Sequence, residues 1–219
     1  MPRIPRLVVP GYPHHVTQRG NRRQKTFFCT DDYLTYLDFI EAALPDAECE
    51  IWAYCLMPNH VHFVLVPRHP SGLALLFKEA HRRYTRKINL RENWRGHLWQ
   101  ERFHSCVMDE PHLNATVRYV ELNPVAAGLC DKPENWRWSS VHAHLEANDD
   151  GLVSVGPMLE RFPDWTKYLG GTQSTEVLQK VRKHSRTGRP LGSENFIEAL
   201  ELLTGRSLKP RKPGRKPIE

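Results

Sequence analysis

Two apolar segments separated by one tight turn constrain the fold of this chain more than any other feature. Residues 50–57 and 60–66 are rich in aliphatic, β-branched and aromatic side chains, and only Pro58 and Asn59 lie between them. Because proline and asparagine favour tight turns, the two segments are predicted to pair as an antiparallel hairpin.

The segments around this hairpin predict further strands and helices. In chain order we expect a strand at 14–19, a helix at 30–45, the hairpin, a helix at 71–90, a strand at 104–108 and a helix at 110–122. This order is typical of an antiparallel sheet with helices packed on it in the split βαβ, or ferredoxin-like, manner. The predicted fold class is α+β. After Lys180 the pattern indicates a linker, a short helix at 193–203 and a Pro/Gly/Lys/Arg tail from Gly205.

Basic side chains gather near both ends of the chain. Within a formal net charge of +6, residues 1–28 hold six basic and no acidic side chains, and residues 180–219 hold eleven basic and four acidic ones. Segregation of this kind is typical of basic arms that meet a polyanion such as nucleic acid. A solvated tail without a partner is the alternative.

Candidate phosphate contacts follow from the same distribution. They are Arg19, Arg22, Arg23 and Lys25 beyond the first strand, and Arg82, Arg83 and Arg86 on the basic face of the second helix. In the tail, Arg215 beside Gly214 resembles a minor-groove hook. A solubilising or non-specifically DNA-binding tail is the alternative for that segment.

Membrane spans and cysteine-based sites are not expected. No apolar stretch approaches the roughly 20 residues that a membrane helix needs, and the first residues lack the apolar core of a signal peptide, so the cytoplasm is the expected location. The five cysteines are scattered and form no Cys-x-x-Cys pair, so the sequence suggests neither a disulfide framework nor a zinc knuckle.

His60 and His62 lie two residues apart on a predicted strand. Alternation sends both imidazoles to one face, and Val61, Val64 and Val66 are expected to pack the other way. Two neutral imidazoles side by side make half of a divalent-metal site. Buried core histidines are the alternative reading.

The third predicted helix carries Tyr119 and Asn123, which are four residues apart and share a helix face. Their phenol and amide are therefore placed to reach one centre. The alternatives are a core aromatic for Tyr119 and, because Pro124 follows it, a helix N-cap for Asn123.

Segments 54–62 and 119–125, which contain these residues, resemble the single-tyrosine HUH transposases, in particular the REP-associated tyrosine transposases of bacteria. The likeness covers about residues 11–140, includes 98–103, and extends to 187–193 and the Arg-rich tail. The resemblance implies a ferredoxin-like HUH endonuclease core, a Mg²⁺ or Mn²⁺ ion, and cleavage of single-stranded DNA beside short palindromic hairpins. It also implies a nucleoid-associated protein, monomeric or homodimeric.

Carried over by position, the resemblance implies that His60 and His62 are metal ligands, that Asn123 is a third, amide ligand, and that Tyr119 is the nucleophile. The implied product is a 5′-phosphotyrosine, a covalent intermediate that needs no nucleotide cofactor. On this basis residues 1–145 form the catalytic domain, 146–185 a wrap or linker, and 186–219 a basic extension.

Two other functions fit parts of the pattern. A histidine phosphoesterase would use His15-Val16-Thr17 as one His-x-Thr element and His60-Val61-His62 as an imperfect second. A catalytically idle hairpin-DNA-binding protein would keep the fold without cleavage, although His60, His62 and Tyr119 are all present.

Overall fold

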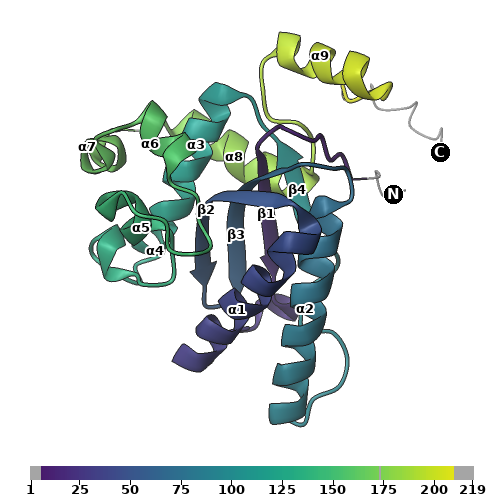
Figure 1. Ribbon diagram of the computed structural model, residues 1–219, viewed down its shortest axis with the longest axis vertical. Helices are drawn as coiled ribbons and strands as arrows, with labels where there is room; N and C mark the ends of the chain where they lie inside the picture. The colour runs from purple at the N-terminus through teal and green to yellow at the C-terminus, as the bar shows by residue number, and fades with distance from the viewer. Residues whose placement is uncertain (1–5, 173, 210–219) are drawn as a thin grey trace, which may run out of the picture.

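A four-stranded antiparallel sheet forms the centre of the fold in the computed structural model, which describes residues 6–172 and 174–209 (Figure 1). Its strands are β1 (His14–Arg19), β2 (Cys49–Met57), β3 (His60–Pro67) and β4 (His104–Val107), in the order β2-β3-β1-β4. β2 and β3 pair in register around Pro58-Asn59, as the sequence predicts. With helices after β1 and β3, this strand order is the ferredoxin-like arrangement, so the α+β fold class is confirmed.

Two long helices cover one face of the sheet. They are α1 (Thr30–Ala47) and α2 (Gly72–Arg91), which lie in front of the strands in Figure 1. Tyr36, Phe77 and Tyr84 from these helices pack with Val61 and Phe63 of β3 in one buried cluster. The side of β3 that carries Val61 is therefore committed to the core.

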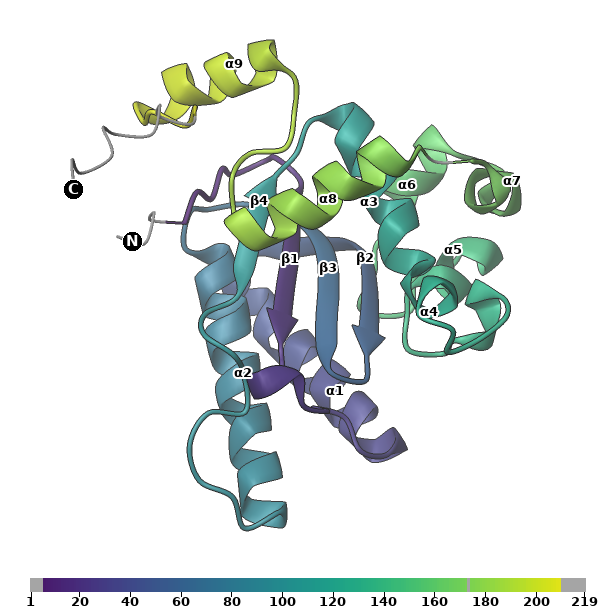
Figure 2. The same cartoon turned by 180° about the vertical axis from the view of Figure 1, so that it is seen from behind.

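The opposite face is covered by α3 (Glu110–Glu121) and α8 (Thr175–Thr187), as Figure 2 shows. Val64 packs there with Val117 and Val120 of α3, in a second cluster. The expectation that Val64 and Val66 lie on the face of Val61 is therefore wrong. In an unbroken strand, residues of even number share the face of His60 and His62.

The C-terminal third of the chain is more helical than the sequence pattern indicates. Instead of a linker beginning at Lys180, the chain forms α8, with Ser174 as its N-cap and Gly188 as its C-cap. The helix expected at 193–203 is present as α9 (Glu194–Thr204). The division into three parts at 145 and 185 stays a prediction. The smaller elements are η1 (Asn21–Arg23), α4 (Asn123–Ala126), η2 (Pro133–Asn135), α5 (Val141–Glu146), α6 (Gly156–Arg161) and α7 (Trp165–Gly170).

Over residues 6–172 and 174–209, none of the helices combines the length and the apolar character that crossing a bilayer would require.

Candidate active site

β1 and β3 together present the two histidines beneath α3. The strands pair antiparallel, with Arg19 opposite His60 and Thr17 opposite His62, and residues directly opposite each other share a face. The ring centroids of His60 and His62 are 4.9 Å apart. The prediction that both imidazoles lie on one side of the sheet is confirmed.

Hydrogen bonds at Nδ1 orient both rings. Nδ1 of His60 donates to Oδ1 of Asn59 at 2.6 Å, and Nδ1 of His62 lies 2.9 Å from Nε2 of His15. On its other side, Nε2 of His62 lies 3.3 Å from Nδ2 of Asn123. Because the amide donates there, Nδ1 of His62 carries the proton and donates to His15. Each ring therefore keeps Nε2 for the site, the arrangement in which metal-ligating histidines are held by partners at the second nitrogen.

Burial keeps these imidazoles neutral. Desolvation, helped by the charge of Arg19, lowers the pKa of His60 to about 3. Desolvation and the neighbouring His60 hold the pKa of His62 well below its usual value. The pKa of His15, which is fully buried, is lowered to about 3 by the same desolvation. Neutral imidazole is the form that binds a divalent cation.

Tyr119 reaches the same place from the last turns of α3. Its half-buried ring stands edge-on to His62, with centroids 5.6 Å apart and planes at 87°. The guanidinium carbon of Arg182, on α8, lies 5.9 Å from the centre of the Tyr119 ring. One chain therefore brings the phenol and both imidazoles together. The Tyr119 ring packs partly against the second buried cluster and also lines an open cleft, so the residue is not a fully buried core aromatic.

A buried carboxylate fixes the helix that carries Tyr119. Glu121, two residues further along α3, accepts hydrogen bonds from Ser140 Oγ at 2.6 Å, His144 Nδ1 at 2.7 Å and Trp165 Nε1 at 2.8 Å. These partners come from the start of α5, from α5 itself and from α7. Because Glu121 is completely buried, this network sets the rotation of α3 and hence the direction of Tyr119.

Asn123 follows directly and begins α4. It makes no side-chain capping hydrogen bond, and its amide instead faces His62. The structure therefore brings together all four residues that the sequence singled out for the chemistry. Their roles as ligands and nucleophile stay predictions.

His60, His62 and Tyr119 line a cleft of about 590 Å³, whereas Asn123 meets it only through its contact with His62. Two of the predicted phosphate contacts, Arg19 and Arg23, also line it. Desolvation at the cleft and the neighbouring charge of Arg23 lower the pKa of Arg19, while the Tyr119 phenol acts in the opposite direction. The remaining lining residues are Thr17, Gln18, Gln100, Glu101, His104, Arg182, Ser185 and Arg186.

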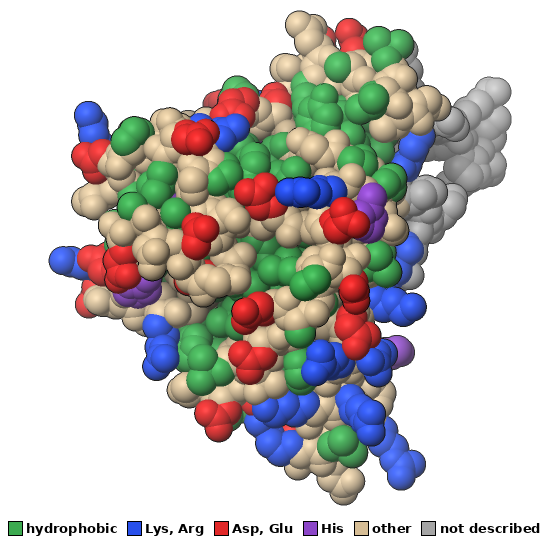
Figure 3. Space-filling view, viewed as in Figure 1, with side chains coloured by type: hydrophobic (Ala, Val, Ile, Leu, Met, Phe, Trp, Pro, Cys, Tyr) green, Lys and Arg blue, Asp and Glu red, His purple; other side chains and the backbone are tan. Residues whose placement is uncertain are grey.

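The other predicted phosphate contacts do not meet the cleft. Arg22 and Lys25 are exposed outside it. Three others, Arg82, Arg83 and Arg86, lie on α2, on the opposite face of the sheet, where Figure 3 shows basic side chains over the lower part of α1 and α2. Arg82 pairs there with Glu79 at 2.8 Å. Arg215 lies outside the described residues.

Sequence reasoning missed the contribution of His15 and of α8. His15 precedes Thr17 by two residues on β1, a spacing that already places both on the face of His62. Arg182, Ser185 and Arg186 belong to a segment interpreted as a linker, and no sequence signal connected it to the histidines.

The donor set fits a metal only in part. Among the described residues no group of three or more His, Cys, Asp or Glu side chains could hold an ion. The chain therefore offers the two Nε2 atoms of His60 and His62 and the amide of Asn123, with the rest of the shell left to oxygen from substrate or water. Such a mixed nitrogen and oxygen set suits Mn²⁺ at least as well as Mg²⁺.

Comparison with known proteins identifies the family. The family model described as "Transposase IS200 like" matches residues 9–123, more than half of the chain. The chain belongs to the IS200-like transposase family. The matched segment contains His60, His62 and Tyr119 and ends at Asn123. Family membership makes the chain a transposase-type, DNA-processing enzyme, as the resemblance seen in the sequence implies.

One solved structure shows the same fold as this transposase, and a second is less similar. A REP-associated tyrosine transposase bound to a REP hairpin is similar at 21% identity and a TM-score of 0.58, over 71% of this chain and 90% of that one. A candidate transposase from Deinococcus radiodurans R1 is similar at 20% identity and a TM-score of 0.40, over 55% of this chain and 96% of that one. None of the curated proteins matches the sequence significantly.

Proposed function

We propose that this transposase cleaves and rejoins single-stranded DNA next to short palindromic hairpins, through a covalent bond between Tyr119 and a 5′ phosphate. The observation that carries the proposal is the convergence of Tyr119, His60 and His62 in one cleft. Family membership supports a DNA substrate. The structurally similar transposase was solved with a REP hairpin, which supports the hairpin as the feature beside which cleavage occurs.

In the proposed reaction the hydroxyl oxygen of Tyr119 attacks phosphorus. The bond from phosphorus to the 3′ oxygen breaks, the phenol loses its proton, and the leaving oxygen takes up a proton to become a 3′-hydroxyl. The phosphodiester energy is kept in the phosphotyrosine, so a second DNA end can be joined without ATP. The half-buried ring, held edge-on against His62, limits the directions from which the phosphate can approach.

Cationic side chains address the charge of the reacting phosphate. Arg19 on β1 and Arg182 on α8 both line the cleft. Guanidinium groups aimed at a phosphate stabilise the additional negative charge of the transition state. Arg19 is exposed at the end of β1, so its attraction to the phosphate should weaken as the salt concentration rises.

A divalent cation, Mg²⁺ or Mn²⁺, would be held by Nε2 of His60 and of His62 together with the amide of Asn123. When bound, it supplies Lewis-acid withdrawal of charge from a non-bridging phosphate oxygen. Asn59 and His15 keep the two rings in the orientation that presents Nε2.

The geometry disfavours the two alternatives. A histidine phosphoesterase would need His15 at the phosphate, but His15 is fully buried and does not line the cleft. An idle binding protein would not need a phenol and two neutral imidazoles facing one another, and this chain keeps all three.

A denaturing gel tests the proposal. Labelled single-stranded hairpin DNA incubated with Mn²⁺ is expected to give a covalent protein–DNA adduct, and EDTA is expected to abolish it. Tyr119→Phe should form no adduct, whereas the matched control Tyr12→Phe, which removes a phenol outside the cleft, should form it normally. An adduct that persists in Tyr119→Phe would refute the assignment of the nucleophile.

A further inference from the structure

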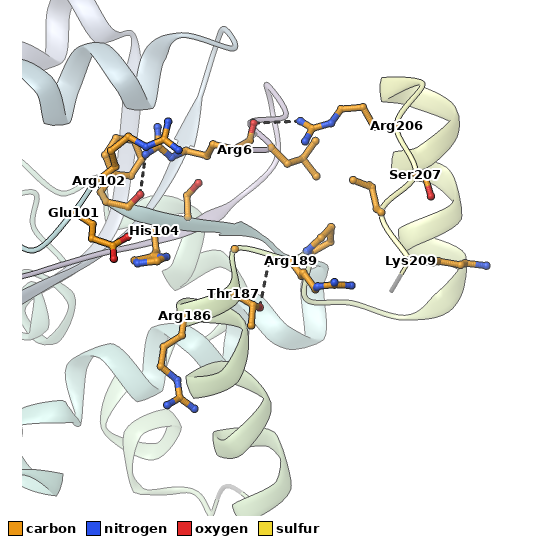
Figure 4. A pocket seen from close by; sticks show the side chains of 16 residues that line it. Arg6, Glu101, Arg102, His104, Arg186, Thr187, Arg189, Arg206, Ser207 and Lys209 are labelled. Carbon is orange, nitrogen blue, oxygen red and sulfur yellow. Dashed lines mark hydrogen bonds between the residues drawn. The ribbon is translucent and has the colours of Figure 1, made fainter. Parts of the chain in front are cut away.

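A second and larger hollow lies beside the active-site cleft (Figure 4). Its volume is about 730 Å³, and its walls come from the N-terminal segment, the start of β4, the end of α8 and the segment after α9. We call it the basic pocket, because six lining side chains are cationic and a single one, Glu101, is a carboxylate. The cations are Arg6, Arg102, Arg186, Arg189, Arg206 and Lys209.

Three of the six cations have no ion-pair partner among the described residues. Lys209 pairs with Glu198 at 2.7 Å, and Arg6 donates to the backbone carbonyl of Phe103 at 2.8 Å. Within residues 6–172 and 174–209, Arg102, Arg186 and Arg189 form no salt bridge. Three guanidinium groups without an ion-pair partner, those of Arg102, Arg186 and Arg189, are therefore available to an anion in this pocket.

Like charges are also held close together here. Partial burial and the neighbouring Arg102 lower the pKa of Arg6 to about 10. Guanidinium groups stay charged even so, and an anion bound between them would remove the repulsion. The closeness of these two guanidinium groups therefore favours the binding of an anion between them.

The basic pocket adjoins the cleft. Glu101, His104 and Arg186 line both. A nucleic-acid strand whose phosphate lies at Tyr119 can therefore continue past Arg186 into the basic pocket without leaving the protein surface.

We propose that the basic pocket binds the sugar–phosphate backbone of the unpaired DNA strand that leads away from the scissile phosphate. The inference rests on the proposed function and adds a second anchoring point to it. The volume lies within the range of about 300–1,000 Å³ typical of small-ligand pockets, enough for a nucleotide and too small for a duplex. Apolar contacts from Leu7, Pro190 and Leu208 suit a sugar and a base.

Binding measurements on the full chain test this inference. A fluorescent oligo-dT strand is titrated, in EDTA so that no cleavage occurs, with wild type, with the double variant Arg102→Ala/Arg189→Ala and with Arg102→Lys/Arg189→Lys. We expect the alanine variant to bind the strand about ten-fold more weakly than wild type. The slope of log K against log salt concentration should become shallower by about 0.7 for each phosphate contact that is lost. The lysine variant keeps the positive charges and should keep the wild-type slope. Lys132→Ala and Arg95→Ala, exposed positions outside both hollows, are the matched controls.

The strand is distinguished from other phosphate sources by two further arms. A blunt duplex of the same length should bind wild type and the alanine variant equally, and free dTMP should compete only weakly with oligo-dT. The inference would be overturned if the alanine variant lost equal affinity for duplex and for single strand, or if its salt slope were unchanged. It would also be overturned if dTMP bound more strongly than oligo-dT.

A truncation series links the basic pocket to the cleavage site. Hairpin substrates are shortened one nucleotide at a time from either end, and affinity is measured for wild type and for the alanine variant. Removal of one particular flanking nucleotide should weaken binding to wild type, because the basic pocket then loses a phosphate. The same removal should not weaken binding to the alanine variant, which lacks that contact already. If both lose the same factor, the flank binds elsewhere and the inference fails. Failure of the proposed function is recognised separately, because wild type would then bind DNA through the basic pocket and yet form no Tyr119 adduct.

Discussion

Nε2 of His15 lies 2.9 Å from Nδ1 of His62, so a buried imidazole on one strand holds its neighbour in place beneath the phenol of Tyr119. His15 does not line the cleft, and it contacts the site through His62 and through the edge-on ring of Tyr119, whose centroid lies 6.3 Å away. Through the contact with His62, β1, which was expected only to complete the sheet, also supports the site. His62 and Tyr119 line the cleft in which the substrate is proposed to bind, whereas His15 helps to orient them from behind.

His15→Phe should therefore weaken metal binding while leaving the cleft open. Without an acceptor at Nδ1, the His62 ring loses its fixed orientation, and losses at such supporting positions are about 10–100-fold in metal affinity. Calorimetric titration of Mn²⁺ measures the effect, and His15→Gln, which keeps an acceptor, should recover part of it. The control is His81→Phe, which removes a half-buried histidine on the α2 side of the sheet. Wild-type Mn²⁺ affinity in His15→Phe would contradict this role.

Glu121→Ala should destabilise the fold and reduce adduct formation together. Three buried donors lose their acceptor, and each unsatisfied group costs about 1–3 kcal/mol. Urea denaturation measures the loss of unfolding free energy, and the hairpin gel measures the adduct. Glu110→Ala on the same helix removes an exposed ion pair to Arg161 and should cost less than about 1 kcal/mol. Equal losses in the two variants would show that the buried network does not position α3.

Arg182→Ala should slow formation of the Tyr119 adduct with little change in DNA affinity. Its guanidinium carbon lies 5.9 Å from the centre of the reacting ring, close to where charge develops. We expect a loss of about 10–100-fold in the single-turnover rate, in keeping with removal of one electrostatic group from an active site. Lys183→Ala, one residue further along α8 and outside the cleft, should react normally. A rate loss explained entirely by weaker binding would assign Arg182 to binding alone.

The parts of the fold that follow from short-range patterns were predictable, and those that depend on long-range packing were not. The hairpin around Pro58-Asn59 and the shared face of His60 and His62 follow from turn chemistry and from strand alternation. Tyr119 and Asn123 follow from helical spacing. In each case the signal lies within a few neighbouring residues.

The helix α8 shows the limit of such reasoning. It buries only Val181 and Ser185, so its sequence lacks a long apolar stripe, and its position on β4 and α3 is decided by tertiary contacts. For the same reason the side of the sheet occupied by α2 was not predictable. Its arginines are basic enough to bind DNA, but the helix packs on the face opposite Tyr119.

Acid should destabilise this fold steeply, because several histidines are buried in the neutral form. Burial lowers the pKa of His14 to about 4 and that of His81 to about 3. Since the unfolded chain protonates near pH 6.5 and the folded chain does not, the unfolded state binds more protons below that pH, and acidification favours unfolding until the folded pKa is reached. Urea denaturation at pH 7.5, 6 and 5 should show a falling free energy, at a rate of up to about 1.4 kcal/mol per pH unit for each such histidine. His81→Phe removes one of these groups, so its free energy should fall less steeply with pH than that of wild type, by about one proton. A slope unchanged by this substitution would mean that His81 takes up its proton equally in both states.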